Sequence, residues 1–445
     1  MALADSCFLQ AAQLPCKDCG SFASLQLAAR FHIARPLAVQ SLSHRRSLLL
    51  GSVASTFCSR ATQSADVGPL FDARKGSQST QQWMPIEMDS KHPPTFVSAP
   101  QRRIIAIGDL HGDINQTRRA LILAGLLTAD GSDTWCGDTA VLVQVGDILD
   151  RGGDEIAILS LLKWLNVQAQ LKGGAVFQVN GNHETINVEE DFRYVDPLGF
   201  LEAENFVNFC EQEHKGNYEA AFAEWRVVSH KRKSEKYNSP NWMPWNLFKM
   251  QKAMAARSFL FRQGGPLAKE LARHGVVLRV NDWLFAHGGI HPHHVEYGLA
   301  RMNKEVSEWM MGVESSSETS SSIPFIATRG YDSVVWSRLY SREMTENSNE
   351  TIKVCAVLKA ALQAAGAKGL VVGHTPQILG ANCKCEGQVW RIDVGMSSGM
   401  LNAQPEVLEI FNDKVRVLSK SSQSSWLMGN DVNGSVTSAG QYTAI

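Results

Sequence analysis

Five short apolar runs are each followed by a cluster of glycines and of side chains that can bind metal ions. This repeated pattern constrains the possible fold more than any other feature of the sequence. The runs are Ile104–Ile107, Val141–Val145, Ala175–Val179, Trp283–Ala286 and Leu370–Val372. Short apolar runs of this kind predict buried strands. Helical segments are expected between several of them, at Gln116–Leu127, Glu155–Gln170 and Ile352–Ala365. Strands that alternate with helices predict βαβ units, and therefore an α/β fold.

Residues 389–418 do not follow this alternation of strands and helices. Three further apolar runs follow one another without helices between them, at Val389–Val394, Glu406–Phe411 and Lys414–Leu418. Asn412–Asp413 separates the last two, which predicts a hairpin turn. We therefore expect a sandwich of sheets with mixed strand directions, flanked by helices.

The chain divides into a leader, a linker, one large domain and a tail. The expected bounds are 1–65 for a transit peptide, 66–100 for a linker, 101–420 for the domain with insertions at 187–270 and 312–324, and 421–445 for a disordered tail. The leader is rich in Ser, Ala and Leu, and its only acidic residues are Asp5 and Asp18, which is typical of an organelle transit peptide. Arg45–Arg46 before a short apolar run leaves a second, thylakoid-type signal open. The insertion 187–270 is aromatic-rich and favours helices.

A polar cluster follows each of the five runs. The clusters are Gly108–Asp113, Gly146–Gly152, Gly181–Glu184, His287–Gly289 and Gly373–Thr375. Ligands of an α/β sheet gather outside the carboxyl ends of its strands, so the five clusters are expected to converge. A single Gly–Asp or Gly–His pair is usually an ordinary turn. Five of them, all at the ends of apolar runs, predict a site.

The side chains in these clusters are those that hold divalent metal ions. Asp, Asn and His suit Mn, Fe or Zn, and two such ions about 3.5–4 Å apart clamp both oxygens of a displacement at phosphorus. A water that bridges the two ions would have its pKa lowered to roughly 7. Asp109 and His111 are assigned to one ion, Asn182, His287 and His374 to the other, and Asp147 to the bridge between them.

Other residues have predicted roles in proton transfer and phosphate binding. His183 is the candidate general acid, with Asp150 holding its imidazole protonated. Arg151 offers a planar fork that matches phosphate oxygens, and Asn182 is expected to hold phosphate as well as metal. A second phosphate-binding arginine is expected, with Arg338 and Arg329 as the two candidates.

The spaced set G-D-x-H-G, G-D-x-x-D-R-G, G-N-H-E, H-G-G and G-H-T resembles the phosphoprotein phosphatases among the calcineurin-like metallophosphoesterases. Four longer stretches are similar to the Shewanella-like protein phosphatases of plants and algae, at Val179–Thr185, Gly264–Ala268, Val372–Gln377 and Arg391–Met396. This resemblance implies a calcineurin-like β-sandwich and a dinuclear centre of the Mn/Fe type. It also implies dephosphorylation of phosphoserine or phosphothreonine by direct attack of water, and a chloroplast location for members with a leader.

The expected function is that of a protein serine/threonine phosphatase that uses a hydroxide bridging two divalent ions, most simply Mn, with Fe or Zn as alternatives. Three alternatives stay open: a small-molecule phosphoesterase such as a dinucleoside polyphosphate hydrolase, a phosphotyrosine phosphatase, and a non-catalytic phosphopeptide-binding module.

The partner is expected to be a phosphoprotein; a regulatory subunit is not predicted either way. A net charge of -1 argues against a nucleic acid as the partner. The sequence contains no run of eighteen or more consecutive apolar residues, so we expect no membrane span. The expected location is the chloroplast stroma rather than the thylakoid lumen, with the mitochondrion as the alternative.

Overall fold

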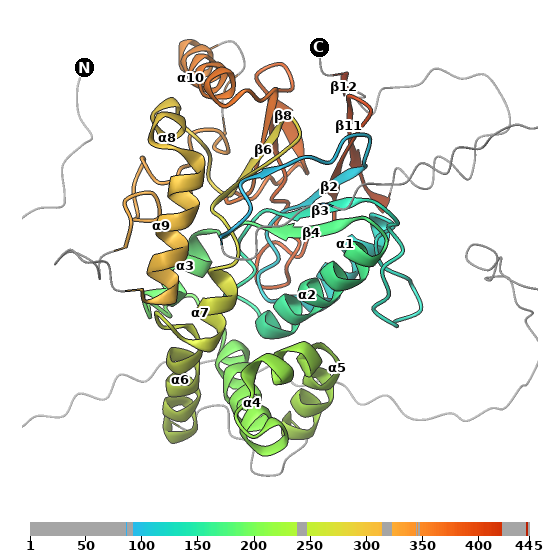
Figure 1. Ribbon diagram of the computed structural model, residues 1–445, viewed down its shortest axis with the longest axis vertical. Coiled ribbons are helices and arrows are strands. Elements are labelled where there is room, and N and C mark those ends of the chain that lie inside the picture. The colour runs from blue at the N-terminus through green and yellow to red at the C-terminus, as the bar shows by residue number, and fades with distance from the viewer. Residues whose placement is uncertain are drawn as a thin grey trace, which may run out of the picture. The chain divides into compact units, whose positions relative to one another are not determined.

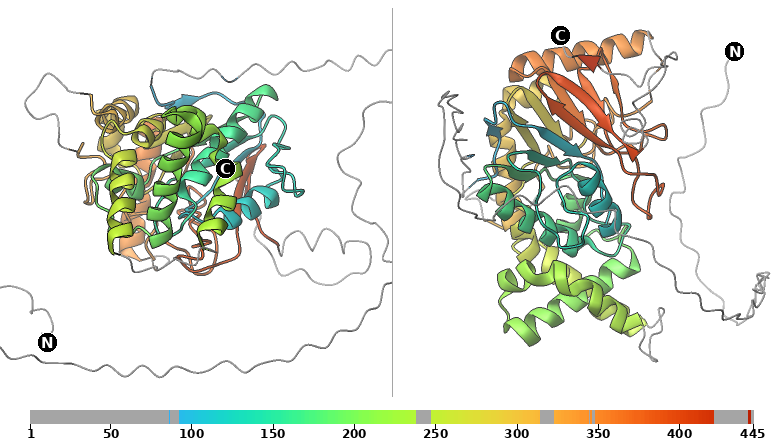
Figure 2. Two further views of the ribbon diagram at one scale, coloured as in Figure 1. Left: turned by 90° about the horizontal axis from the view of Figure 1, so that it is seen from below. Right: turned by 90° about the vertical axis from the view of Figure 1, so that its right-hand side faces the viewer.

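The structure is a computed structural model that describes residues 86, 92–237, 247–313, 323–343, 345, 348–420 and 442–443. Its core is a pair of six-stranded sheets flanked by helices, which confirms the predicted α/β sandwich of mixed sheets (Figures 1 and 2). The expected transit peptide 1–65 lies outside the described residues. No helix in the described ranges has the length and apolar character needed to cross a membrane.

Both sheets contain a block of three parallel strands, and these blocks carry the predicted site. One sheet has the order β12(Tyr442–Thr443), β11(Lys414–Leu418), β10(Val407–Phe411), β2(Ile104–Ile107), β3(Val141–Gln144), β4(Ala175–Gln178). The other has the order β1(Phe96–Val97), β5(Val277–Val280), β6(Trp283–Ala286), β7(Gly369–Val372), β9(Val389–Arg391), β8(Asn382–Lys384). The parallel strands are β2, β3 and β4 in the first sheet and β6, β7 and β9 in the second. All five predicted clusters follow strands of these two blocks.

The alternation of side chains along each strand explains how the sheets pack. Ala106, Val143 and Phe177 share one buried cluster with Phe285 and Val371, so these side chains fill the space between the two sheets. The neighbouring residues on β2, β3 and β4 belong to another cluster, which includes α1(Ile114–Leu123) and α2(Glu155–Leu171). Each strand is apolar on both faces because one face meets the other sheet and the opposite face meets helices.

The predicted element boundaries were close, and the differences have local causes. Helix α1 begins at Ile114, two residues before the prediction, because the side chain of Asp113 accepts a hydrogen bond from Gln116 N and caps it. The hairpin between β10 and β11 is confirmed, with Asn412 and Asp413 at φ 49° and 58°. These left-handed values are those of a type I′ turn.

Two predicted boundaries differ from the structure. Residues 66–100 were expected to be a linker, but Phe96–Val97 pair with Arg279–Val280, so the end of that segment belongs to a sheet. The tail 421–445 was expected to be disordered, but Tyr442–Thr443 pair with Lys414–Val415. The rest of the tail lies outside the described residues. Neither two-residue strand carries a periodic pattern that is long enough to detect.

The insertion is helical, as predicted. It contains α4(Pro197–His214), α5(Tyr218–Tyr237), α6(Leu247–Phe261) and α7(Pro266–Leu271), and Figure 1 shows α4, α5 and α6 grouped beyond α2. The remaining helices are α3(Asn182–Val188), α8(Pro292–Tyr297), α9(Leu299–Met311) and α10(Asn349–Ala365). The second predicted insertion, 312–324, falls largely outside the described residues.

Candidate active site

The loops that follow β2, β3, β4, β6 and β7 bring the predicted residues into one buried site. Several of these residues have the left-handed backbone that side chains other than glycine rarely adopt. The φ angles are 41° at His111, 55° at Asp147, 68° at Asp150, 66° at Arg151 and 71° at His374. Strain of this kind costs roughly 1–3 kcal/mol per residue and is concentrated at functional sites. The loops therefore turn sharply at the residues that carry the predicted chemistry.

Three glycines make room for the polar side chains. A Cβ atom on Gly181 would lie 2.2 Å from Asp147 Oδ1, and one on Gly373 would lie 2.4 Å from Asp109 Oδ1. A Cβ on Gly146 would lie 2.8 Å from His287 Nδ1. The glycines of the motifs are thus required by close contacts with the candidate ligands.

One group of candidate metal ligands is centred on His287 Nε2. This atom lies 3.0 Å from Asp147 Oδ2, 3.1 Å from Asn182 Oδ1 and 3.1 Å from His374 Nδ1. The outer ring nitrogens face main-chain carbonyl oxygens, His287 Nδ1 that of Val145 at 2.9 Å and His374 Nε2 that of Trp336 at 3.1 Å. In the neutral rings those outer nitrogens carry the protons, so the inner nitrogens present lone pairs. Four acceptor atoms then face one another, which suits a cation between them.

The second group of candidate ligands is centred on His111. Its Nε2 lies 3.9 Å from Asp109 Oδ2 and 3.9 Å from Asp147 Oδ2, while its Nδ1 faces the carbonyl oxygen of Leu149 at 2.9 Å. His183 Nε2 is also near, at 3.8 Å from Asp147 Oδ2. Asp147 is common to both groups, which is the position that the predicted bridging role requires. The donor set therefore fits two divalent cations, with Asp147 between them.

The buried charges in the site also indicate that it binds cations. Burial raises the pKa of Asp109 well above its usual range, and the carboxylates of Asp393 and Asp147 add to the effect. Burial also raises the pKa of Asp393, to about 6. Buried carboxylates this close to one another need a compensating positive charge, which divalent cations supply. For Asp147, burial would raise the pKa, but His287 and His183 hold it well below its usual range.

Two acidic residues of the motifs were given no role from the sequence. Asp393, in the loop after β9, lines the cavity beside the ligands. The Oδ2 atom of Asp393 has no hydrogen-bond partner in the described structure. Glu184 accepts hydrogen bonds from the main-chain N–H groups of Asp147, Ile148, Leu149 and Gly181, at 2.7–3.1 Å. Glu184 thereby ties the loop after β3 to the loop after β4. Their positions in the motifs R-I-D-V-G and G-N-H-E were the only available signal.

The predicted general acid and its carboxylate partner lie together. His183 Nδ1 is 2.5 Å from Asp150 Oδ2, and both side chains are buried. Burial alone would lower the pKa of His183, but Asp147 and Asp150 outweigh it and raise the pKa. The other oxygen, Asp150 Oδ1, accepts hydrogen bonds from Asn187 Nδ2 at 2.9 Å and Arg257 Nη2 at 3.4 Å. His183 is therefore held in one orientation with its Nε2 toward the cavity.

A cavity of about 260 Å³ opens beside these residues, and both predicted arginines line it. Arg151 stacks on the ring of Tyr194, 5.5 Å from its centroid, and its Nη2 lies 3.5 Å from His183 Nε2. Arg338 donates from Nη1 to the carbonyl oxygen of His374 at 3.0 Å and to Thr375 Oγ1 at 2.7 Å. The alternative candidate, Arg329, does not line the cavity. It lies over the ring of Trp336, 4.5 Å from the centroid.

A two-sheet α/β fold with paired His/Asp ligand groups between its strand ends defines a metallophosphoesterase. Residues 102–377 match the calcineurin-like phosphoesterase family. The chain is 38% identical over 330 residues to Shewanella-like protein phosphatase 2 of Arabidopsis thaliana, covering 71% of this chain and 77% of that protein. It is 28% identical over 321 residues to Shewanella-like protein phosphatase 1 of Plasmodium berghei, covering 71% and 74%. The chain belongs to the Shewanella-like protein phosphatases of the calcineurin-like phosphoesterase family.

The similarity to solved structures is weaker. A cold-active protein-tyrosine phosphatase of a Shewanella species matches with a TM-score of 0.47 and 20% identity, over 73% of this chain and 80% of that one. A protein serine/threonine phosphatase of Saccharomyces cerevisiae matches with a TM-score of 0.40 and 12% identity, over 72% and 77%.

Proposed function

We propose that the protein hydrolyses phosphoserine and phosphothreonine in protein substrates. The observation that carries this proposal is the buried dyad of His183 and Asp150, in which Asp150 favours the protonated imidazole. A serine or threonine leaving group departs as an alkoxide, which is about as basic as hydroxide and needs a proton. A tyrosine leaving group has a pKa of about 10 and needs that proton much less. A site built to supply a proton therefore supports the serine/threonine assignment.

The two ligand groups are proposed to hold two divalent cations, Mn²⁺ first, with Fe or Zn as alternatives. When bound, such ions polarise phosphoryl oxygens and provide hydroxide at neutral pH. Asp109, His111 and Asp147 would hold one ion, and Asp147, Asn182, His287 and His374 the other. Arg151 and Arg338 are proposed to bind the phosphate oxygens, with Asn182 as an additional donor from its amide. His183 is proposed to pass its Nε2 proton to the leaving oxygen.

The experiment compares wild type and His183→Asn on two substrate series with manganese present. The first series contains matched phosphoserine, phosphothreonine and phosphotyrosine peptides, together with diadenosine tetraphosphate. The second contains aryl and alkyl phosphates whose leaving groups span a wide pKa range. We expect His183→Asn to lower kcat by about 10²–10⁴-fold on poor leaving groups and far less on good ones. Equal losses on both would contradict the acid role.

The peptide series tests the substrate class separately. Hydrolysis of phosphotyrosine peptides alone, or of diadenosine tetraphosphate alone, would overturn the serine/threonine proposal in favour of that substrate. Metal content of both proteins, measured by mass spectrometry, must stay equal. If His183→Asn lost metal instead, His183 would be a ligand, in keeping with its place beside His111 and Asp147.

The leader composition supports a further proposal, import into the chloroplast stroma. A fusion of residues 1–65 to a fluorescent protein in plant cells tests it. Plastid fluorescence would support the proposal. Mitochondrial fluorescence would overturn it, and a signal confined to the thylakoid lumen would favour the twin-arginine interpretation of Arg45–Arg46.

A further inference from the structure

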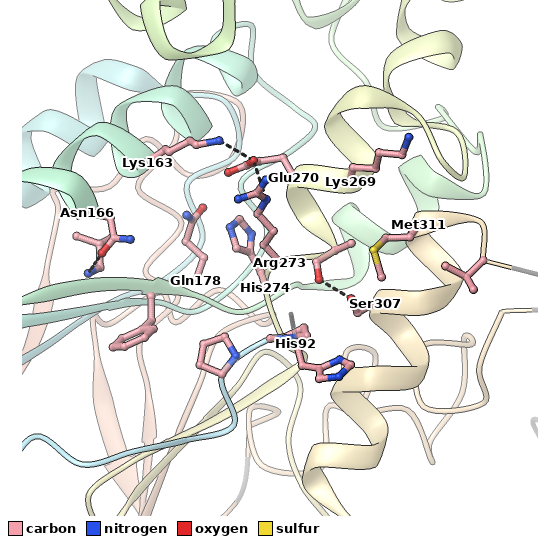
Figure 3. A pocket seen from close by; sticks show the side chains of 16 residues that line it. His92, Lys163, Asn166, Gln178, Lys269, Glu270, Arg273, His274, Ser307 and Met311 are labelled. Carbon is pink, nitrogen blue, oxygen red and sulfur yellow. Dashed lines mark hydrogen bonds and ion pairs between the residues drawn. The ribbon is translucent and has the colours of Figure 1, made fainter. Parts of the chain in front are cut away.

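Arg151 lines the cavity beside the candidate ligands without an acidic partner. Within the described residues it forms no ion pair, and its Nε is buried without a hydrogen-bond partner. A larger cavity, of about 730 Å³ beside β4 and α7, shows the usual pairing of cations (Figure 3). There, Lys163 Nζ and Arg273 Nε lie 2.9 and 3.5 Å from the same oxygen, Glu270 Oε2. The charge of Arg151 is not neutralised in this way, so it stays available for an anion.

Two uncharged side chains hold the guanidinium of Arg151. Its Cζ lies 5.5 Å from the ring centroid of Tyr194, and its Nη1 donates to Met400 Sδ at 2.9 Å. A thioether sulfur is only a weak acceptor, and an aromatic ring carries no net charge. Nη2 faces His183 Nε2 at 3.5 Å, the atom proposed to carry a proton, which provides no acceptor either. These contacts orient the guanidinium without competing strongly for its hydrogen bonds.

The turn that carries Met400 is anchored to the candidate site. Met400 N donates to the carbonyl oxygen of Ser397 at 2.9 Å, and Ser397 Oγ donates to that of His111 at 3.0 Å. A Cβ atom on Gly399 would lie 2.0 Å from the carbonyl oxygen of Arg151, so the turn packs against the main chain of that arginine. The sulfur is therefore held beside the guanidinium by the fold of this turn.

The sulfur of Met400 is also within reach of small molecules in the cavity. The Met400 side chain is half-buried and lines the cavity, whereas Met302, Met310 and Met396 are fully buried. Met254 on α6 is 43% exposed and lies outside the cavity lining, which makes it a suitable comparison. Oxidation of methionine to its sulfoxide needs access to the sulfur, and the sulfoxide is polar where the thioether is not.

We propose that Met400 is an oxidation site through which a peroxide weakens phosphate binding by Arg151. The sulfur attacks one oxygen of hydrogen peroxide, so that an S–O bond forms and the O–O bond breaks. Sulfur is oxidised by two electrons, and the second oxygen leaves as hydroxide, which takes up the remaining proton and becomes water. The product is methionine sulfoxide, which methionine sulfoxide reductases return to methionine.

The new oxygen changes the contact with Arg151. A sulfoxide oxygen is a much stronger acceptor than a thioether, so it holds Nη1 in a hydrogen bond that a phosphate oxygen must displace. The oxygen also takes up space in a cavity of only about 260 Å³. This inference rests on the proposed function, in which Arg151 binds the phosphate of the substrate.

The test measures the Kd of inorganic phosphate for the manganese-loaded full chain by calorimetric titration. Titrations are made before and after treatment with hydrogen peroxide, which is then removed with catalase. Peptide mass spectrometry measures sulfoxide at each methionine. Met400→Leu removes the sulfur and nearly keeps the volume, and Met400→Gln places an amide oxygen near the guanidinium. Met254→Leu is the matched control at an exposed methionine outside the cavity.

We expect oxidation to raise the Kd for phosphate by about tenfold in wild type and in Met254→Leu, because a charge-assisted hydrogen bond to Arg151 is weakened. Methionine sulfoxide reductase should restore the original Kd. Met400→Gln should bind phosphate about tenfold more weakly than wild type without any peroxide. Met400→Leu should have the same Kd before and after the treatment.

Three results would overturn the proposal. One is equal weakening by peroxide in Met400→Leu, and another is sulfoxide at Met400 with an unchanged Kd. The third is sulfoxide at Met254 but not at Met400. Loss of manganese on oxidation would assign the effect to the metal site and would overturn it as well. A wild-type Kd in Arg151→Ala would instead contradict the phosphate contact, and turnover of phosphoserine peptides by the untreated chain tests the proposed function separately.

Discussion

Arg257 donates to Asp150 across 107 residues of sequence, with 3.4 Å between Nη2 and Oδ1, and both side chains are fully buried. Arg257 belongs to α6 of the insertion, whereas Asp150 follows β3 and orients the candidate acid His183. Arg257 also pairs with Glu155 and donates from Nε to Asn187 Oδ1 at 2.9 Å. The insertion therefore contributes a residue that positions the proposed dyad of His183 and Asp150.

Arg257→Met should weaken both folding and turnover. The substitution leaves Glu155 and Asp150 as buried carboxylates without their cation, which typically costs 3–5 kcal/mol. With Asp150 less constrained, kcat on phosphoserine peptides should fall by about tenfold or more, while KM changes little. Denaturant unfolding and steady-state kinetics measure the two effects. Lys252→Met on the same helix is the control, because the side chain of Lys252 is 64% exposed and its ion pair with Glu204 is long, at 3.7 Å. A loss no larger than that of Lys252→Met would contradict the positioning role.

Removal of the shared carboxylate charge should abolish metal binding at both ligand groups. Asp147→Asn keeps the shape but loses the anionic donor common to both groups. Manganese at about one hundred times its Kd stabilises the wild type by about 2.7 kcal/mol, so its Tm should rise on adding manganese. The Tm of Asp147→Asn should not rise when manganese is added. A manganese-dependent rise in both proteins would exclude Asp147 as the bridge. Asp113→Asn, which retains an oxygen to cap α1, is the folded control.

Adding a methyl group at Gly181 should weaken metal binding without backbone strain. Gly181 has an ordinary φ of -96°, but its Cβ would lie 2.2 Å from Asp147 Oδ1. Gly181→Ala should therefore displace that carboxylate and lower the metal affinity by about 10–100-fold, as loss of support for a ligand usually does. Gly330→Ala is the matched control, since its Cβ would meet no atom within 4 Å. Calorimetric titration with manganese measures the affinity of each variant. Equal affinities would show that the loop shifts to accommodate the methyl group without displacing Asp147.

The convergence of the candidate ligands was predictable from the sequence because each of them follows a run whose strand character is local. Ile104–Ile107 became β2 without change, and Asp109 and His111 lie where the strand end directs them. The role of Arg257 was not predictable, because α6 has no motif and its contact with Asp150 depends on how the insertion packs. Strand β5 was missed as well, since Val277–Val280 follows a short loop and contributes no ligand. Contacts between distant segments, such as Glu184 with the loop after β3, require the folded structure.

The charge network at Glu409 should make stability depend on pH in a defined direction. Burial alone would raise the pKa of Glu409, but hydrogen bonds from Arg416 and Arg103 hold it below its usual value. A carboxyl whose pKa is lower in the folded state stabilises the protein above the unfolded pKa, about 4.3, and loses this effect as the pH falls further.

Glu409→Gln should therefore cost about 1–3 kcal/mol at pH 7 and clearly less at pH 3.5. Urea unfolding of both proteins at the two pH values measures the difference. Glu350→Gln removes a comparable but exposed pair with Arg342, and should change stability by less than about 1 kcal/mol at either pH. A penalty for Glu409→Gln that does not shrink in acid would show that shape rather than charge matters there.

The two candidate arginines for the second phosphate contact differ in position, so paired substitutions decide between them. Arg338 lines the cavity beside the candidate ligands and is held by the carbonyl oxygen of His374 and by Thr375 Oγ1. Arg329 is also exposed, but it stacks on Trp336 outside the cavity lining. A charge-assisted hydrogen bond contributes about 1.5–3 kcal/mol, so Arg338→Ala should lower kcat/KM by roughly ten- to a hundredfold. Arg329→Ala should change kcat/KM by less than about twofold.

Inorganic phosphate, as a product inhibitor, should bind more weakly to Arg338→Ala in the same proportion, because the contact is to the phosphate and not to the peptide. If Arg329→Ala caused the larger loss, Arg329 would have to leave Trp336 when substrate binds.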